Sequence, residues 1–364
     1  MKRFLLIPLV VLLVSGLILG GCAAPAPAPA PEKTWNLKLA HEQTEANDFH
    51  VYGHVPWAQN VEKATNGRVK VTIFPNQVLM KSKDAWEGVQ SGIADVAWIF
   101  TGFFPGQFDL LDSISLPFMA PNAEVASRTA WALYEKFPEI QAQSADAKIL
   151  TVWTTEPYWF LTTKKHIKVL EDFKGMKIRM TGGPPTEMMK LLGGVPMMVP
   201  MPDNYLNLQK GVTDGMAGPA EAIVGFRIYE VAKYYTFVPT VCVSFLLAMN
   251  KDVWNEMPPD IQEAIMSVSG ESQSIRYGGY CFDGAREKMP GIIEKAGYEM
   301  ITYTPPKEEV DRWIEVAGKP LWDGWAEKME AKGHANAREI LDETLRLVEQ
   351  YSAGRTDMWR DLAK

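Results

Sequence analysis

The chain has 364 residues, with 37 Lys and Arg against 44 Asp and Glu, and a formal net charge of −7. Because it is acidic and carries no basic arm or patch, we do not expect it to bind nucleic acid. Its length suits one large or two ordinary domains, and only the N-terminal segment is apolar enough to enter a membrane.

That N-terminal segment has the pattern of an exported, anchored protein. Lys2 and Arg3 precede an uncharged Leu/Val-rich run, which predicts a signal peptide over 1–21. Small residues before Cys22 resemble the lipobox of bacterial lipoproteins and predict a lipidated cysteine, the alternative being an incidental cysteine after an ordinary signal peptide. Residues 22–34 are rich in Ala and Pro, so we expect an extended spacer that holds the chain at the outer face of the cytoplasmic membrane, in the periplasm.

Strand and helix patterns then alternate. Residues 35–40 and 68–74 alternate apolar and polar side chains, as half-buried strands do, and 93–100 is a nearly continuous apolar run. Helical spacing falls between these strands, over 49–65 and 82–91. This β-α-β-α-β order predicts a parallel sheet with right-handed crossovers.

The pattern repeats farther along the chain with different residues. The expected strands and helices lie at 149–153, 158–162, 177–180, 186–192, 204–210, 245–249 and 298–303, with long helices near 261–296 and beyond. We expect two α/β lobes, one formed by 35–155 with 243–282 and the other by 156–242 with 283–364. Ligands of such folds bind beyond the carboxyl ends of the strands, here between the lobes.

A family resemblance rests on residues 171–179, which read Glu-Asp-Phe-Lys-Gly-Met-Lys-Ile-Arg. They resemble the central signature of the DctP-like substrate-binding subunits of tripartite ATP-independent periplasmic (TRAP) transporters. Further similar segments follow the order of that family, at 67–71, 74–76, 91–95, 116–118, 192–194, 199–202 and 208–215.

The resemblance implies an α/β, two-lobe (Venus-flytrap) periplasmic binding protein with mainly parallel sheets, crossover strands and long C-terminal helices bridging the lobes. Such a protein captures a small organic anion and delivers it to the small and large membrane subunits of the transporter. An ion gradient drives that transport, so we expect no enzyme activity, no cofactor and no metal site in this chain.

Arg179 is the principal candidate for the anion site. The resemblance implies that it pairs with the carboxylate of the solute. Alternation supports this independently, because Ile178 and Met180 share one face of their strand and Arg179 has the other. A helix is expected to begin close by, and its N-terminus would favour an anion. The alternative is a surface arginine paired with Glu171 or Asp172.

The chain also departs from the family in ways that bear on the solute. Trp159 stands where many members carry a second arginine, and residues 216–219 read Met-Ala-Gly-Pro where many have Gln-Glu-Asn-Pro. Fewer charged groups predict a monocarboxylate, such as an aromatic, hydroxy or keto acid. The other expected ligand-binding residues lie mostly after strands, although core packing is the alternative for each aromatic: Thr44, Asn47, Gln77, Phe100, Thr101, Tyr158, Trp159, Tyr205, Gly218 and Glu221.

Other classes of function remain open at this point. A binding protein for an ATP-driven importer and a sensor lipoprotein would share the export signal, and an exported hydrolase is the enzymatic alternative. The chain has no Gly-x-Ser-x-Gly, P-loop or dinucleotide-binding motif, and its histidines lack zinc-site spacing. Cys242 and Cys281 are free to pair or to remain buried thiols.

Overall fold

A computed structural model describes residues 33–363. The predicted signal peptide, Cys22 and nearly all of the predicted spacer lie outside the described residues. In the part that is described, no helix combines the length and apolar character that a membrane crossing requires.

The first sheet contains five strands in the order β2-β1-β3-β10-β4. β1 pairs in parallel with β2 and β3, as the β-α-β-α-β pattern predicts, whereas β10 pairs antiparallel with β3 and β4. The strands are β1 (Trp35–Ala40), β2 (Val69–Phe74), β3 (Val96–Phe100), β4 (Ala147–Thr154) and β10 (Ser244–Asn250). The helices between and beside them are η1 (Phe49–His54), α1 (Val55–Ala64), η2 (Ser82–Asp84), α2 (Ala85–Gln90), η3 (Thr101–Phe103), η4 (Leu111–Ser115), α3 (Ala123–Lys136), α4 (Pro138–Ala142), α8 (Lys251–Asn255) and α9 (Pro259–Ser267).

The second sheet contains six strands in the order β11-β9-β5-β8-β6-β7. β6 is parallel to β7 and β8, while β5 is antiparallel to β8 and β9, so this sheet is mixed as well. Its strands are β5 (Trp159–Thr162), β6 (Lys177–Met180), β7 (Val195–Met198), β8 (Gly215–Gly218), β9 (Tyr234–Thr236) and β11 (Ile301–Tyr303). The helices among them are η5 (Leu170–Phe173), α5 (Pro184–Leu191), α6 (Met201–Gln209), α7 (Ala220–Gly225) and η6 (Ile228–Glu230).

Two extended segments connect the sheets. Residues 155–158 lead from β4 to β5, and residues 237–243 return from β9 to β10. The segments are hydrogen-bonded to each other, because Thr155 N–H donates to the Val243 carbonyl and Tyr158 N–H to the Val241 carbonyl, both at 2.9 Å. The return explains the mixed pairing, since β10 enters the first sheet from the opposite end.

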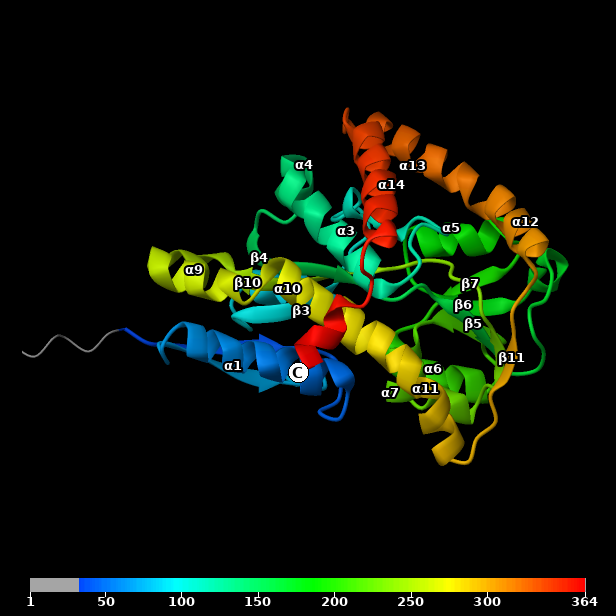
Figure 1. The fold of residues 1–364 in the computed structure, drawn as a ribbon, viewed down its shortest axis with the longest axis horizontal. Helices are drawn as coiled ribbons and strands as arrows, with labels where there is room; N and C mark the ends of the chain where they lie inside the picture. The colour runs from blue at the N-terminus through cyan, green and yellow to red at the C-terminus, as the bar shows by residue number, and fades with distance from the viewer. Residues whose placement is uncertain (1–32, 364) are drawn as a thin grey trace, which may run out of the picture. The chain divides into compact units, whose positions relative to one another are not determined.

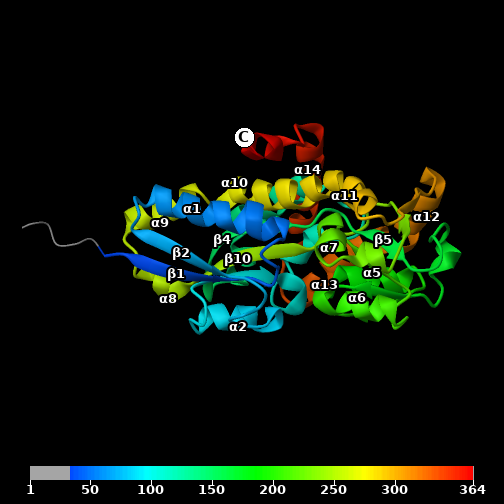
Figure 2. The same ribbon diagram turned by 90° about the horizontal axis from the view of Figure 1, so that it is seen from below.

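The C-terminal half is largely helical. α10 (Gly270–Ile275), η7 (Arg276–Asp283) and α11 (Gly284–Lys295) follow one another without a break, and they contact α3 beside the first sheet and α7 beside the second (Figures 1 and 2). α12 (Lys307–Ala317), α13 (Lys319–Ala331), α14 (Ala337–Ala353) and η8 (Met358–Ala363) complete the chain. α14 packs on α3, next to the first sheet, and the lobe boundaries given above stay a prediction.

One apolar cluster runs through both sheets. It includes Leu39 and Trp153 from the first sheet and Phe160 and Ile178 from the second, all essentially fully buried. Each such side chain contributes on the order of 1.5–3 kcal/mol by leaving water. Cys242 and Cys281 are buried free thiols. The α/β class with two sheets agrees with the sequence prediction, although each sheet mixes parallel and antiparallel pairs.

Candidate solute-binding site

Arg179 is a buried cation on β6. Its neighbours Ile178 and Met180 are buried in the core that joins the sheets, and Arg179 itself is only 5% exposed. Its Nε donates to the Val199 carbonyl at 2.9 Å, which orients the guanidinium. No carboxylate of the described residues lies within 4.0 Å of it. Arg179 is therefore a desolvated guanidinium whose remaining donors have no ion-pair partner in that part of the chain.

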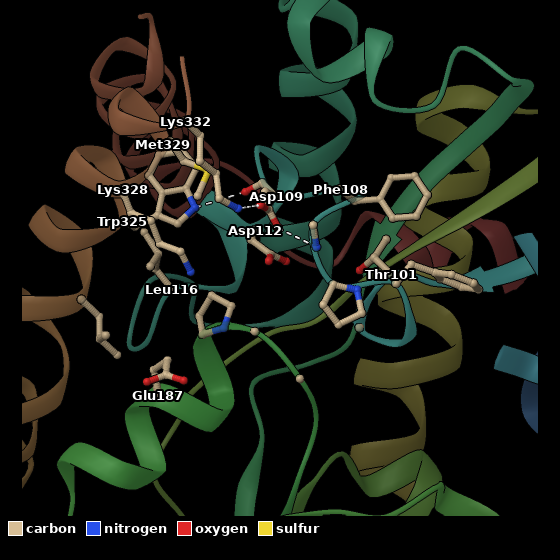
Figure 3. A pocket seen from close by; sticks show the side chains of 18 of the residues that line it. Thr101, Phe108, Asp109, Asp112, Leu116, Glu187, Trp325, Lys328, Met329 and Lys332 are labelled. Atoms are coloured by element: carbon tan, nitrogen blue, oxygen red, sulfur yellow. Dashed lines mark hydrogen bonds and ion pairs between the residues drawn. The ribbon is translucent and has the colours of Figure 1, made fainter. Parts of the chain in front are cut away.

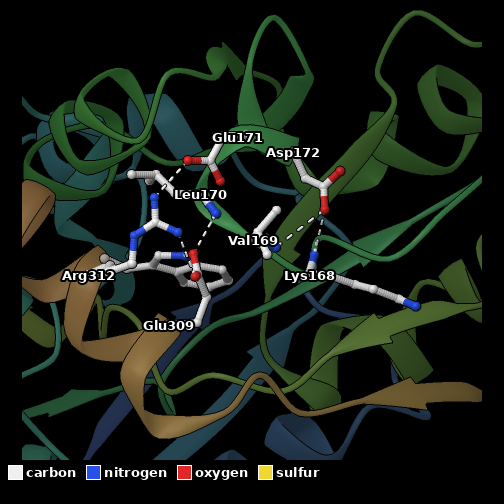
Figure 4. Close-up of polar contacts among 8 residues, drawn as sticks. Lys168, Val169, Leu170, Glu171, Asp172, Glu309 and Arg312 are labelled. Atoms are coloured by element: carbon white, nitrogen blue, oxygen red, sulfur yellow. Dashed lines mark hydrogen bonds and ion pairs between the residues drawn. The ribbon is translucent and has the colours of Figure 1, made fainter.

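The two acidic residues that could have paired with Arg179 are engaged elsewhere (Figure 4). Asp172 accepts the backbone N–H groups of Lys168 and Val169, and it pairs with Lys165 at 2.6 Å. Glu171 pairs with Arg312 at 2.7 Å. Both carboxylates therefore stabilise the turn before β6 and its contact with α12, and the alternative of a surface salt bridge for Arg179 is wrong.

Arg179 lies where two chambers meet. A wide outer chamber of about 530 Å³ is lined by Gln77 and Ser82 of the first sheet's loops and by residues 198–200, 202 and 203 of the second. A narrow inner chamber of about 50 Å³ lies behind it. Five residues line both chambers: Glu42, Phe100, Phe103, Arg179 and Thr181. A solute whose acid group meets Arg179 therefore lies between the two chambers, and its body enters the inner one only if that chamber widens.

The walls of the inner chamber are mainly aromatic. Phe100 and Phe103 meet edge to face, with ring centroids 4.8 Å apart, and Trp98 lies 4.7 Å from Phe245. The aromatic lining comes from both sheets, from the crossing segments and from the helix that bridges them: Phe49, Trp98, Phe100, Phe103, Tyr158, Phe226, Phe245 and Phe282. Such walls favour a flat apolar ring, because aromatic pairs gain about 0.5–1.5 kcal/mol beyond area burial.

The polar groups of the inner chamber include one cation and two carboxyls. Burial raises the pKa of Glu42, although a hydrogen bond from Ser82 Oγ and the nearby Arg179 oppose the rise. Burial likewise raises the pKa of Glu221 to about 7, against the opposing hydrogen bond from Asn47. Burial also raises the pKa of Tyr158 to about 12, so its hydroxyl keeps its proton. The balance of charge favours a solute with one acid group.

Five of the residues expected from the sequence line these chambers: Gln77, Phe100, Tyr158, Arg179 and Glu221. Asn47 lies directly behind Glu221 and donates a hydrogen bond to its carboxyl. Thr101 donates from Oγ1 to the Ser244 carbonyl at 2.9 Å and lines a different cavity. The site role of each of these residues stays a prediction.

The other expected residues lie away from the chamber walls. Trp159 packs edge to face on Phe237, beneath the Arg286 guanidinium. Successive residues of extended backbone point to opposite faces, and Tyr158 takes the face that lines the inner chamber. The Tyr205 hydroxyl is hydrogen-bonded to Glu230. Gly218 pairs with Trp159 in the sheet, and Thr44 is exposed. Neither chamber is lined by any of these four, and their contact with solute stays a prediction.

Several lining residues were missed by the sequence analysis. Glu42 and Gln43 follow β1 directly, so the rule that ligand-binding residues follow strands would have found them beside Thr44. Thr155 and Thr181 also lie at the ends of strands. Phe245 and Phe282 carry no such signal, because β10 and η7 reach the chamber only through tertiary contacts.

A second cavity of about 440 Å³ lies between η3, α5 and α13 (Figure 3). Lys332 pairs with Asp109 there, and the Lys328 side chain lies near Asp112, with Glu187 on the opposite wall. Burial and the neighbouring Asp109 raise the pKa of Asp112 to about 7, against the attraction of both lysines. This cavity thus carries charges of both signs.

The N-terminus of α5 opens on the second cavity rather than on the chambers beside Arg179. α5 begins at Pro184, two residues earlier than expected, and Pro184 lines that cavity. Pro184 and Pro185 have no N–H groups to offer an anion. The expected contribution of this helix N-terminus to anion binding is therefore not supported, and the guanidinium of Arg179 stands alone.

Three histidines lie behind the first strand. His41 is hydrogen-bonded to His50 at 3.0 Å and stacks on His54, whose Nδ1 contacts the Tyr277 hydroxyl at 2.8 Å. Burial, reinforced by His50, lowers the pKa of His41 to about 3, so these rings are neutral at ordinary pH. Among residues 33–363, no group of three or more His, Cys, Asp or Glu side chains is arranged to hold a metal ion.

Comparison with known proteins gives a consistent result. The model of the DctP family, described as bacterial extracellular solute-binding protein, family 7, matches residues 39–328. The C4-dicarboxylate-binding periplasmic protein DctP of Rhodobacter capsulatus is 25% identical over 282 residues, which are 77% of this chain and 83% of that protein.

Solved structures of similar proteins hold small organic acids. A TRAP solute-binding protein from Rhodoferax ferrireducens, with copurified benzoate, is 26% identical with a TM-score of 0.81, over 87% of this chain and 98% of that one. One from a marine metagenome, specific for aromatic acids and holding 3-hydroxybenzoate, is 25% identical with a TM-score of 0.82, over 88% and 99%. One from Bordetella bronchiseptica, with bound mandelate, is 25% identical with a TM-score of 0.80, over 87% and 99%.

Proposed function

Because this chain belongs to family 7 of the bacterial extracellular solute-binding proteins, the DctP family, we propose that it captures an aromatic monocarboxylic acid. It acts outside the cytoplasm as the substrate-binding subunit of a TRAP transporter, and it delivers the acid to the membrane subunits. The fold and the small organic acids held by similar proteins support the general role. The class of solute is inferred from the chambers of this chain.

The observation that carries the proposal is the buried Arg179 at the mouth of an aromatic chamber. A guanidinium that is 5% exposed and has no carboxylate of the described residues within 4.0 Å is costly to leave unpaired. A solute carboxylate would satisfy its free donors in a bidentate pair. The hydrogen bond from Nε to Val199 holds the group in place before the solute arrives.

The charge of the chamber argues for a single acid group. Glu42 and Glu221 both line the inner chamber, and Arg179 is its one cation among the described lining residues. A second carboxylate on the solute would meet these acidic side chains without a partner, which is unfavourable in a desolvated site. The aromatic walls then favour a ring as the body of the solute. The proteins with bound benzoate, 3-hydroxybenzoate and mandelate support this class.

Delivery requires that the sheets close on the solute and later separate. The two crossing segments and the bridging run α10–η7–α11 are the connections about which the sheets can rotate, as in hinge closure around other ligands. The chain supplies the binding step, and an ion gradient across the membrane supplies the driving energy through the membrane subunits.

The chain is anchored, in this proposal, through a lipid on Cys22. The support is the apolar run before the small residues and the cysteine, followed by the Ala/Pro spacer. Cys22→Ser is expected to release the exported protein into the soluble fraction. If the variant stays with the membranes after fractionation, the anchor lies elsewhere.

The solute class is tested by thermal shift and calorimetry. Benzoate is expected to raise the unfolding temperature and to give a measurable heat of binding. Benzamide, which keeps the ring and lacks the charge, and phthalate, which adds a second acid group, are expected to bind at least about tenfold more weakly. Equal binding of benzamide would refute the role of Arg179, and tighter binding of phthalate would refute the monoacid class.

A further inference from the structure

Glu221 stands at the wall of the inner chamber in a fixed orientation. The Asn47 side-chain amide nitrogen donates to Glu221 Oε1, and the Asn47 Oδ1 accepts the Phe49 N–H at 2.8 Å. Because its oxygen is engaged, Asn47 can turn only its nitrogen toward Glu221. A loop of the first sheet therefore positions a carboxyl carried by α7 of the second sheet.

The hydrogen bond between Asn47 and Glu221 passes close to Gly225. A methyl group at Gly225 would come within 2.8 Å of Asn47 Nδ2 and 3.5 Å of Glu221 Oε1. Glycine at this position thus makes room for the hydrogen bond. A separate cavity of about 60 Å³, lined by Asn47, Glu221, Gly225 and Lys288, also borders the pair.

One carboxyl oxygen of Glu221 remains available to a ligand. Asn47 uses Oε1, and no donor in the described part of the chain bonds to Oε2. Glu221 is 8% exposed and lines the same chamber as Arg179. The ionised form of Glu221, which predominates as the pH rises above about 7, only accepts hydrogen bonds, so an apolar solute atom placed against it would remove its water without compensation.

We propose that Glu221 is a specificity-determining residue that accepts a hydrogen bond from a hydroxyl on the ring of the solute, away from the acid group. The preferred solute is then a hydroxylated aromatic monoacid. This inference rests on the proposed function and deepens it, since Arg179 binds the acid group and Glu221 recognises the hydroxyl on the opposite side of the ring.

Physical chemistry supports a strong preference. Hydrogen bonds to charged groups are stronger than neutral ones, and a site built to bond a hydroxyl rejects the analogue that lacks it. The rejection arises because the buried acceptor is left unpaired. A methoxy group at the same ring position has an oxygen but no proton to donate. Comparing the hydroxy acid with the methoxy acid therefore tests the donated hydrogen bond.

The experiment compares benzoate, 3- and 4-hydroxybenzoate and the matching 3- and 4-methoxybenzoates by calorimetry. At one ring position or the other, the unaltered protein is expected to bind the hydroxy acid at least about tenfold more tightly than the methoxy acid. Glu221→Gln is expected to reduce this ratio to within about threefold, because Asn47 retains the oxygen of the introduced amide and its nitrogen faces the solute.

Glu156→Gln is the matched control. Glu156 is another buried carboxyl, whose Oε1 accepts the N–H of Ala220, next to Glu221 in the sequence, but it lines neither chamber. This substitution is expected to leave the hydroxy-to-methoxy ratio unchanged. A drop of the same size in both variants would show that the ratio responds to the packing of this region and would overturn the inference.

The outcomes separate this inference from the proposed function. Hydroxy and methoxy acids that bind the unaltered protein equally, while benzamide does not bind, would overturn the role of Glu221 and keep that of Arg179. A uniform loss of affinity for every acid in Glu221→Gln would make Glu221 a structural residue. If no aromatic acid binds at all, the proposed function itself fails.

Discussion

Two hollow regions of the described residues differ in how their charges are paired. The chambers around Arg179 hold a buried guanidinium without an ion pair among the described residues, surrounded by aromatic rings. The cavity beside α13 is much larger than the inner chamber, but Lys332 is already paired with Asp109 and Lys328 lies near Asp112. Volume does not distinguish the two regions, because the outer chamber and the α13 cavity are of similar size.

The difference shows what distinguishes the proposed solute site from the other cavity. Charges that satisfy one another, as on α13, stabilise the contact between elements and need no ligand. A desolvated charge that is held in place by one hydrogen bond and left without a counter-ion is prepared for a partner from outside. Three pairs of substitutions test this contrast.

The largest effect is expected from removing one cation of each region in turn. Arg179→Ala is expected to weaken binding of an aromatic monoacid at least about tenfold, or 1.4 kcal/mol, by calorimetry. Lys328→Ala removes the corresponding cation beside α13 and is expected to change the affinity less than about twofold. If the two variants lose affinity equally, the distinction between the regions is wrong.

A smaller effect is expected where the two regions touch. Gly102 and Gly182 line both the outer chamber and the α13 cavity, and a methyl group at Gly182 would come within 2.9 Å of the Gly102 carbonyl oxygen. Gly182→Ala is expected to hold the sheets apart and to weaken solute binding several-fold, about 1 kcal/mol, without contacting the solute.

Gly324→Ala is the control for that substitution. Gly324 also lines the α13 cavity, but a methyl group there meets nothing within 4 Å. We expect unchanged affinity and a small gain in stability, since alanine favours a helix. Unchanged affinity in Gly182→Ala as well would show that the approach of the two glycines does not matter for binding.

The smallest effect concerns the pH dependence of stability. The pKa of Asp112 is raised from 3.8 to about 7 by burial and by Asp109, so the folded state holds this proton more tightly than the unfolded chain. The stabilisation of the folded state by protonated Asp112 is present below about pH 4 and is lost as the pH rises through 7. Asp112→Asn is therefore expected to be more stable than the unaltered protein at pH 8, by about 1 kcal/mol, and not at pH 4.

Urea unfolding at pH 4 and pH 8 measures this difference in stability. Glu343→Gln is expected to change stability in the opposite direction. Hydrogen bonding to Arg346 lowers the pKa of Glu343 to about 2, so its stabilisation is present above about pH 4.5 and is lost as the pH falls through 2. Removing its charge is expected to destabilise the protein at pH 8. A destabilised Asp112→Asn at pH 8 would show that the charges beside α13 do not balance as described.

Much of the fold and part of the site could be predicted from local patterns. The alternation around β1, β2 and β3 is a property of single segments, and it gave the parallel part of the first sheet. The same alternation placed Arg179 on the face of β6 opposite Ile178. Trp159 lines neither chamber, because its neighbour Tyr158, just before β5, takes the chamber side.

By itself, the sequence determined the succession of strands and helices and the family resemblance, and it predicted Arg179 as the anion site and a solute with one acid group. These follow from periodicity and from the types of residue present. Only the tertiary structure decided which side chains surround Arg179. Glu42 follows the first strand, Glu221 lies on α7, and Phe245 and Phe282 come from β10 and η7. They meet because the chain crosses twice between the sheets, and such long-range proximity leaves no trace in local spacing.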